Sequence, residues 1–266
     1  MPQDILLQFD EALPPCPRHL PSLKFTQPFP DLTTFHEAVI ETARVSWENR
    51  ARSEYIGVLL LRQFHGILID LNAPADMQEL VLLMQLQEQR HTRHCIAMAK
   101  RLGSDATISC DLEELRIARQ PQAAVQFYEM LCSTYLVGEV LALKLLQATI
   151  ACLPSSAFKD CLKNILKDEA LHSQFGRMAL DYLRGSQNNW LPYPGDDWIK
   201  SQIKANLIGL GERDVIEADE AKMFTNWDFA AQLPYLGVPD SRHFKKIYDE
   251  ALAHDIPAHL KRMSLS

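Results

Sequence analysis

The sequence predicts an all-α protein built around a bundle of four long helices. Four segments have apolar residues at helical spacing and contain no proline beyond the first position. Proline and glycine gather instead in the stretches between these segments. Each segment is far longer than the average helix of about 11 to 12 residues. Helices of this length must bury their apolar faces against one another, and a four-helix bundle is the simplest arrangement that does so.

The first part of the chain is an arm followed by the first long helix. Residues 1–30 are rich in proline, which excludes a long helix, so we expect an extended arm that wraps on the body of the protein. Asp31 can cap the first long helix. The helical spacing of apolar residues continues to Asp70.

The second long helix follows a break at residues 72–74. We expect Asp76 to cap it and the helix to end near Leu102, just before a glycine. Residues 104–120 then form a connection, with a short helix over residues 112–118.

The third and fourth long helices are separated by a turn. The third is expected to begin at Pro121, because the first turn of a helix tolerates proline, and to continue to about Cys152. Residues 153–156 provide a turn and a helix cap, and the fourth helix continues to Arg184. The bundle therefore spans residues 31–185.

The remaining residues, 186–266, are expected to form a helical C-terminal extension packed on the bundle. It begins with an irregular linker around Trp190–Trp198, which either lines a substrate entrance or covers the core. Three helical stretches are expected within the extension, at residues 196–210, 213–231 and 241–254.

Composition excludes several classes of function. The formal net charge is -7 and the basic patch that nucleic-acid binding needs is absent, so we expect no nucleic-acid partner. The six cysteines include no Cys-x-x-Cys pair, which suits a reducing cytoplasm better than a zinc site or a disulfide framework. No basic and apolar leader and no run of 18 apolar residues is present. We therefore expect a cytoplasmic protein that does not span a membrane.

Two Glu-x-x-His tetrads carry the candidate chemistry. They join Glu88 to His91 in the second long helix and Glu169 to His172 in the fourth. A spacing of three places both side chains of a tetrad on one helix face, where they can bind one ion or two adjacent ions. Both tetrads share that face with residues typical of a core, namely Val81, Met84, Cys95, Leu162, Ile165 and Gly176. Buried carboxylates are costly without a partner, so the pattern indicates bound cations.

The other two long helices each offer a further inward glutamate. Glu139 lies within an almost entirely apolar stretch, which is a poor place for a solvated charge. Glu54 shares a helix face with apolar residues, although Glu48 and Glu41 compete for the same role. Glu54 precedes Glu88 by about as many positions as Glu139 precedes Glu169, which places the four carboxylates at one level of the bundle.

The ligand types predict which ions bind. Four ionised carboxylates balance two divalent cations and leave two neutral imidazoles as softer donors. Mixed oxygen and nitrogen ligation favours iron or manganese over structural zinc, which prefers closed tetrahedral sites rich in thiolate. We therefore expect two Fe ions, with Fe/Mn and Mn/Mn pairs left open.

This arrangement resembles the ferritin-like di-iron carboxylate superfamily across residues 31–184. That superfamily has a Glu from each of two helices and a Glu-x-x-His motif from each of the other two. The strongest string, residues 167–176, looks like the Asp-Glu-x-x-His element of the oxygen-activating members. By that match, Asp168 holds His91 through a hydrogen bond. The matching position in the second helix is Gln87 instead of Asp, which leaves the support of His172 open.

Within the superfamily, the chain looks closest to bacterial ferritin-like proteins with a helical C-terminal extension. It also resembles the amine-oxidising N-oxygenases, but their extra histidine falls on Ile165 here, so N-oxygenation is weakly supported. Tyr135 and Tyr128 lie on inward turns before Glu139 and serve either as redox or supporting groups or as packing residues. His94 and His65 are expected to be surface or hydrogen-bonded groups and not ligands.

The ligand set and the resemblance lead to the hypothesis of a non-haem di-iron oxygenase or oxidase. It would use dioxygen and an external electron donor to oxidise a small organic substrate, with the metal centre itself as the catalytic group and no separate protein acid or base. Two alternatives stay open: a ferroxidase or iron-handling protein, and a non-catalytic helical interaction protein whose carboxylates face water. The oligomeric state is also open, with a homodimer as one alternative.

Overall fold

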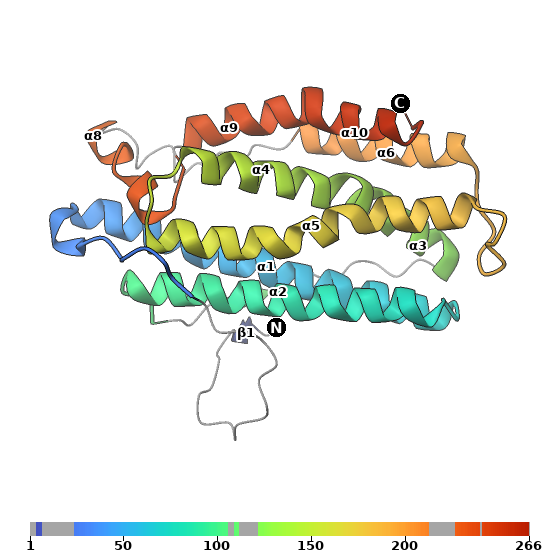
Figure 1. Ribbon diagram of the computed structural model, residues 1–266, viewed down its shortest axis with the longest axis horizontal. Coiled ribbons are helices and arrows are strands. Elements are labelled where there is room, and N and C mark those ends of the chain that lie inside the picture. The colour runs from blue at the N-terminus through green and yellow to red at the C-terminus, as the bar shows by residue number, and fades with distance from the viewer. Residues whose placement is uncertain are drawn as a thin grey trace, which may run out of the picture.

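The computed structural model describes residues 4–6, 24–105, 109–111, 122–212, 227–239 and 241–265. Within these ranges the protein is helical, apart from one pair of three-residue strands (Figure 1). The prediction of an all-α protein is therefore confirmed for the described part of the chain, and its long helices pack as a bundle.

The first two long helices form an antiparallel pair along one side of the bundle (Figure 1). Helix α1 spans Glu37–Asp70 and helix α2 spans Ala75–Arg101. Asn72 lies in the turn between them with a positive φ of 53°, a conformation that asparagine tolerates better than most residues.

The third bundle helix changes its pitch partway. Helix α3 spans Ala123–Met130, a π-helix, η2, spans Leu131–Gly138, and α4 spans Glu139–Cys152. The fourth is α5, Ala157–Arg184, which Ser156 caps by accepting a hydrogen bond from the backbone N–H of Lys159. π-Helical turns are rare and often occur at functional sites. Here the π-helix ends directly before Glu139.

The predicted caps of the first two helices were wrong. Asp31 accepts a hydrogen bond from the backbone N–H of Thr33 and so caps a short 3₁₀ helix, η1, Leu32–Thr34. His36 caps α1 instead, through its Nδ1 atom. Asp76 lies inside the first turn of α2, where its carboxylate is near the positive end of the helix dipole, and Pro74 occupies the cap position.

The connection after α2 contains a strand that the apolar pattern did not predict. Strand β2, Ser109–Asp111, pairs antiparallel with β1, Asp4–Leu6. Three-residue strands are too short to show the alternation that identifies longer strands. The short helix predicted at residues 112–118 lies outside the described residues.

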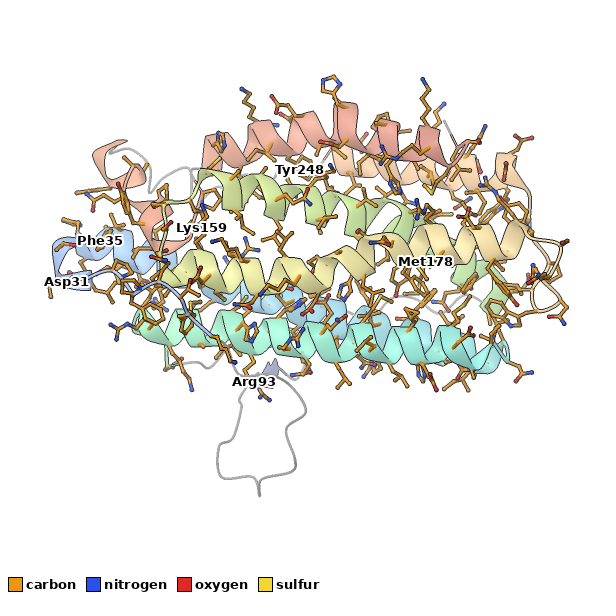
Figure 2. All side chains as sticks on the ribbon, in the orientation of Figure 1. Asp31, Phe35, Arg93, Lys159, Met178 and Tyr248 are labelled. Carbon is orange, nitrogen blue, oxygen red and sulfur yellow. The ribbon has the colours of Figure 1, made fainter. Side chains whose placement is uncertain are left out.

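The described end of the N-terminal arm, from residue 24, packs on the start of α5. The Asp160 carboxylate accepts hydrogen bonds from the backbone N–H groups of Thr26, at 2.8 Å, and Gln27, at 3.0 Å. The ring of Phe29 contacts that of Phe158 edge to face, with centroids 5.4 Å apart. Asp31 and Phe35 lie at the end of the bundle where α1 begins (Figure 2).

The C-terminal extension forms a helical layer over α4 (Figure 1). The helices predicted at residues 196–210 and 241–254 are present, and the second continues to Arg262 because Pro257 falls in a first turn. Of the helix predicted at residues 213–231, only the last residues are described. The described elements of the extension are α6, Asp196–Gly211; α8, Trp227–Ala230; a 3₁₀ helix, η3, Leu233–Leu236; α9, Ser241–Glu250; a π-helix, η4, Ala251–Asp255; and α10, Ile256–Arg262. Of these, α9 and η4 pack on α4 and α6 packs on η2, whereas α8 and η3 contact α1.

The buried apolar residues form two separate clusters along the bundle. One contains Phe64, Tyr135 and Phe175, and the other contains Trp47 and Phe158. Between them, at one level of the bundle, α1, α2 and α5 carry buried or partly buried polar side chains instead. The core is therefore interrupted by a polar layer, and this layer holds the candidate site.

One helical segment of the described chain, Ala123–Cys152, is long and apolar enough by composition alone to cross a membrane. The core helix of a soluble protein passes the same test. This segment contacts α5 and the C-terminal layer, and 39% of its 18-residue apolar window is buried.

The contact between α5 and η2 provides a stability prediction. A Cβ atom at Gly176 would lie 2.5 Å from the backbone oxygen of Tyr135, whereas one at Gly66 in α1 would meet nothing within 4 Å. We expect Gly176→Ala to lower the free energy of unfolding by about 1–3 kcal/mol, because the two backbones must separate. The matched control Gly66→Ala should raise it by about 0.4–1 kcal/mol. Urea denaturation measures both, and equal effects of the two variants would contradict the packing described.

Candidate metal centre

Six side chains from four helical segments meet in the polar layer. Glu54 comes from α1, Glu88 and His91 from α2, Glu139 from the start of α4, and Glu169 and His172 from α5. Their donor atoms form two groups, and within each group the atoms lie within 4.8 Å of one another. The structure thus brings together all six residues that the sequence pattern selected, and these groups can hold a metal ion.

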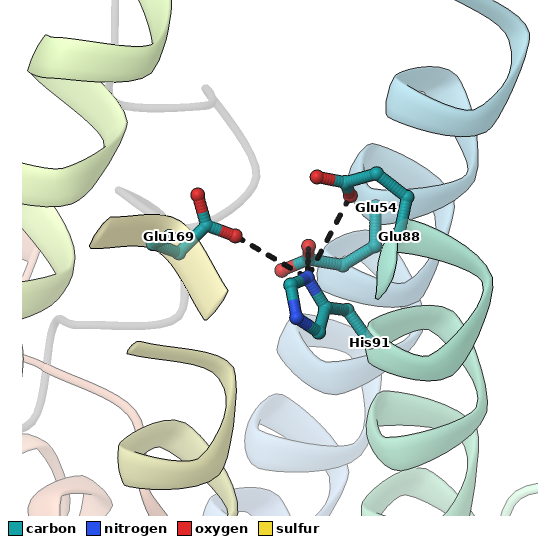
Figure 3. A group of neighbouring side chains, drawn as sticks. All are labelled: Glu54, Glu88, His91 and Glu169. Atoms are coloured by element: carbon teal, nitrogen blue, oxygen red, sulfur yellow. Dashed lines mark ion pairs between the residues drawn. The ribbon is translucent and has the colours of Figure 1, made fainter. Parts of the chain in front are cut away.

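The first group surrounds His91 (Figure 3). Its Nδ1 atom lies 3.2 Å from Oε1 of Glu169, 3.5 Å from Oε2 of Glu54 and 3.8 Å from Oε2 of Glu88. The His91 side chain is fully buried. Three carboxylates therefore face one buried imidazole nitrogen.

The second group surrounds His172, whose side chain is also buried. Its Nδ1 atom lies 2.9 Å from Oε1 of Glu88, 3.5 Å from Oε2 of Glu169 and 3.9 Å from Oε2 of Glu139. Glu169 belongs to both groups. Glu88 belongs to the first group and also contacts His172, so Glu88 and Glu169 each turn one carboxylate oxygen toward either histidine. Glu54 and Glu139 contact one histidine each.

The structure also distinguishes among the first-helix glutamates. Glu48 and Glu41 both pair with Arg44 on the same helix, away from the two histidines. Glu54 is the one that contacts His91. The arginine four residues before Glu48 was the sequence signal that could have separated these roles, because such pairs are common on exposed helix faces.

The Nε2 atoms of both histidines have hydrogen-bond partners at equivalent positions, each one residue before a tetrad. Nε2 of His91 lies 2.9 Å from Asp168, as the resemblance implied, and Nε2 of His172 lies 3.1 Å from Oε1 of Gln87. Gln87 also donates to Asp168 at 3.3 Å, and Arg90 pairs with the same carboxylate. Sequence reasoning left the support of His172 open, yet Gln87 precedes its tetrad by one residue just as Asp168 does.

These hydrogen bonds fix which imidazole nitrogens face the centre. Because Asp168 and Oε1 of Gln87 are acceptors, the histidines carry their N–H groups at Nε2 and turn the Nδ1 lone pairs inward. Both Nδ1 atoms are buried and have no hydrogen-bond partner among the described residues. A lone pair that faces carboxylate oxygens is repelled unless a cation or a proton lies between them. The residues present therefore fit a metal ion.

The pKa values show that the clustered histidines and glutamates favour bound positive charge. Burial would lower the pKa of His172, but its close contact with Glu88 and the negative charges of Glu139 and Glu169 outweigh burial and raise the pKa to about 9. The pKa of His91 likewise rises well above its ordinary value. Burial raises the pKa of Glu54, and it raises the pKa of Glu139 to about 8. The metal-free cluster therefore binds protons tightly, at the place where metal cations would bind in a loaded protein.

Gly57 provides room for one of the shared carboxylates. It lies on α1 opposite Glu88, and a Cβ atom there would come within 2.8 Å of Oε2 of that residue. Any larger residue would push the carboxylate away from the histidines. In the sequence this glycine was visible only as an interruption of a long helix.

A cavity of about 840 Å³ adjoins the cluster. Its wall includes all four glutamates and neither histidine, and it extends between α1, α4, α6 and the residues that follow η3. The cavity is within the size range of sites that bind small molecules. The histidines thus close one side of the cluster, and the carboxylates face an open space.

The two tyrosines singled out by the sequence differ in their surroundings. Tyr135 is buried between Phe64 and Phe175, and its hydroxyl has no partner among the described residues. Burial raises the pKa of Tyr135 well above its usual value, with the charges of nearby Glu139 adding to the effect. Tyr128 donates its hydroxyl hydrogen bond to the backbone oxygen of Pro192 and contributes to packing.

The remaining sequence candidates lie outside the cluster. His94 is buried on α2, where burial lowers its pKa to about 4, and His65 is partly buried on α1. Trp190 and Trp198 pack on the apolar core and do not line the cavity, so the linker covers core instead of forming an entrance. Cys95 is buried beside the cluster, and burial raises the pKa of its thiol well above the ordinary value, which suits packing better than ligation.

Comparison of the chain with protein-family models, with curated proteins and with solved structures finds no match.

The raised pKa values predict how the metal-free protein responds to pH. His172 binds its proton more tightly when folded, so its stabilising effect is complete below about pH 6.5 and is lost as the pH rises through about 9. Glu139 also has a raised pKa, so stability falls as the pH rises from about 4.5 to about 8. We expect the Tm of the metal-free protein to fall by several degrees between pH 6.5 and pH 9.

Saturation with Mn²⁺ should flatten this dependence, because the cation replaces the protons. Thermal unfolding at a series of pH values, with and without Mn²⁺, makes the comparison. A metal-free Tm that stays constant or rises over this range would contradict the assignment.

Proposed function

We propose that this protein is a ferritin-like, non-haem di-metal oxidoreductase that uses dioxygen to oxidise a small organic substrate. The observation that carries the proposal is that Glu88 and Glu169 are each shared between two buried histidines, beside a cavity large enough for an organic molecule. Shared carboxylates are suited to bridging two adjacent cations.

Charge and ligand count support two cations over one. Four carboxylates and two neutral imidazoles are balanced by two divalent ions. Each ion would receive one histidine nitrogen, one oxygen from each shared glutamate, and an oxygen from Glu54 or Glu139. Oxygen-rich ligation with one imidazole per ion suits iron or manganese. The four glutamates that would hold the ions also line the cavity, so a substrate bound there would lie beside the metals.

The bound metals would supply the redox chemistry of dioxygen. The chain's own residues position the ligands and shape the site. Asp168 and Gln87 hold the two imidazoles by their Nε2 atoms, and Arg90 in turn holds Asp168. Burial of His91 and His172 keeps water from the imidazole side of the site, and an external donor would supply electrons.

The competing hypotheses are separated by specific observations. A helical interaction protein would turn its carboxylates to water, whereas the side chains of Glu88 and Glu169 are only 7% and 8% exposed. A ferroxidase treats iron as its substrate and has no need of a large cavity for an organic molecule. The cavity of about 840 Å³ therefore favours an organic substrate.

Metal stoichiometry tests the bridging arrangement. We expect the wild-type protein to bind two Fe²⁺ ions per chain under anaerobic conditions. Glu88→Gln or Glu169→Gln should weaken both sites, because each residue serves both histidines, while Glu54→Gln or Glu139→Gln should weaken one. Glu79→Gln, an exposed change on α2, is the matched control and should bind two. Equal losses from all four ligand variants would contradict the shared geometry.

Reaction with oxygen tests the activity. After anaerobic loading with two Fe²⁺ ions, exposure to air should oxidise both and change the near-ultraviolet absorption, and His172→Ala should abolish the change. Iron uptake should stop near two ions per chain. Uptake far beyond that would favour iron storage, and an unchanged spectrum would rule out an oxygen-activating centre.

A further inference from the structure

The cavity beside the metal ligands contains an unusual positive charge. Among the described residues that line it, Arg50 is the only one with a cationic side chain. Arg50 precedes Glu54 by one helical turn on α1, a rise of about 6 Å along the helix axis. A cation at this place faces the same space as the metal ligands.

Among the described residues, no carboxylate forms an ion pair with Arg50, whose side chain is partly buried. Arg44, Arg90 and Arg184 each form an ion pair with an aspartate or glutamate. Within the described chain, the Arg50 guanidinium contacts the Trp47 ring, whose centroid lies 6.0 Å from the guanidinium carbon. Partly buried charges are normally paired, so this guanidinium is free to bind an anion.

The ring that supports Arg50 is itself held firmly. The indole N–H of Trp47 donates a hydrogen bond of 2.8 Å to the backbone oxygen of Leu236. Gly237 follows with a φ of 81°, and a Cβ atom there would come within 2.8 Å of the Trp47 ring. The Trp47 ring beside Arg50 is therefore fixed before a ligand binds, which lowers the entropic cost of binding.

A second polar group in the cavity wall also lacks a partner. Thr149 of α4 is 1% exposed, and its hydroxyl makes no hydrogen bond with any described residue. It lines the same cavity as Arg50. Its neighbours Leu146 and Ile150 belong to the apolar cluster that contains Trp47, so Thr149 lies toward the Arg50 end of the cavity.

We propose that this cavity binds an organic monocarboxylate, with its carboxylate on Arg50, within reach of the Thr149 hydroxyl, and its apolar part directed along the wall toward the metal ligands. A guanidinium suits a carboxylate because it can donate two parallel hydrogen bonds. One unpaired cation balances one negative charge. The apolar residues in the wall and the volume of about 840 Å³ favour an organic molecule over a small inorganic anion. The identification of this acid as a substrate rests on the proposed function, but its binding does not.

Calorimetric titration of the Mn²⁺-loaded protein with octanoate and with 1-octanol tests the proposal. Wild-type protein should bind octanoate more tightly than the alcohol. Arg50→Gln should weaken octanoate binding by about tenfold to a hundredfold, the usual range for a hydrogen bond to a charged group, and leave alcohol binding unchanged. Arg62→Gln, an exposed change of the same charge on α1, is the control and should bind like wild type.

Two further variants keep the test decisive if Arg50→Gln does not fold. Arg50→Lys should retain part of the preference for octanoate, and Thr149→Val should weaken octanoate binding alone. Octanoate affinity equal to that of 1-octanol in wild-type protein would overturn the proposal. Inorganic phosphate that binds as tightly as octanoate in an Arg50-dependent manner would also overturn it, because the site would then be a simple anion site.

Metal content separates this inference from the proposed function. Arg50→Gln should keep the wild-type metal stoichiometry, because the residue is not among the ligands. If wild-type protein binds no metal but still prefers octanoate through Arg50, the di-metal function fails and the acid-binding site stands. If it binds two ions without preferring octanoate, the acid-binding site fails and the di-metal function stands.

Discussion

The structure depends on four carboxylates gathered at one level of a helical bundle, with Glu88 and Glu169 buried and Glu54 and Glu139 partly buried. Apolar residues fill the bundle on either side of this level, and the polar layer between them cannot be solvated as a surface would be. Buried carboxylates are stable only when positive charge meets them. The two histidines are neutral when their Nδ1 lone pairs point inward, so they can bind a cation but add no positive charge. The fold therefore requires protons or cations at its centre, and its geometry suits cations.

The same requirement explains the residues around the ligands. Asp168 and Gln87 occupy equivalent positions, each directly before a tetrad glutamate, and each accepts the Nε2 hydrogen of the histidine on the other helix. The hydrogen bond between Gln87 and Asp168 joins the two halves of this support. Gly57 keeps space for Glu88, and the π-helix ends where Glu139 begins. Local irregularities in long helices thus coincide with the ligand positions.

The helix periodicity was sufficient to predict the long helices, and the two tetrads predicted four of the six clustered residues, because both depend on local spacing. Glu139 followed from its apolar surroundings, whereas Glu54 was preferred over Glu48 by its spacing to Glu88, and the pairing of Glu48 with Arg44 was not used. The helix caps were misassigned, since several polar residues near a helix start can each accept the same backbone hydrogens. Strand pairing between β1 and β2 and the unpaired state of Arg50 depend on contacts between distant segments, so no local pattern reveals them.

Anomalous X-ray diffraction from crystals of the Mn²⁺-loaded protein tests the central claim most directly, because it locates ions without assumptions about activity. The account predicts two anomalous peaks per chain, about 3.5–4 Å apart, both between the carboxylates of Glu88 and Glu169 and each within ligand distance of Nδ1 of one histidine. The absence of peaks, or a single peak that contacts neither histidine, would contradict it.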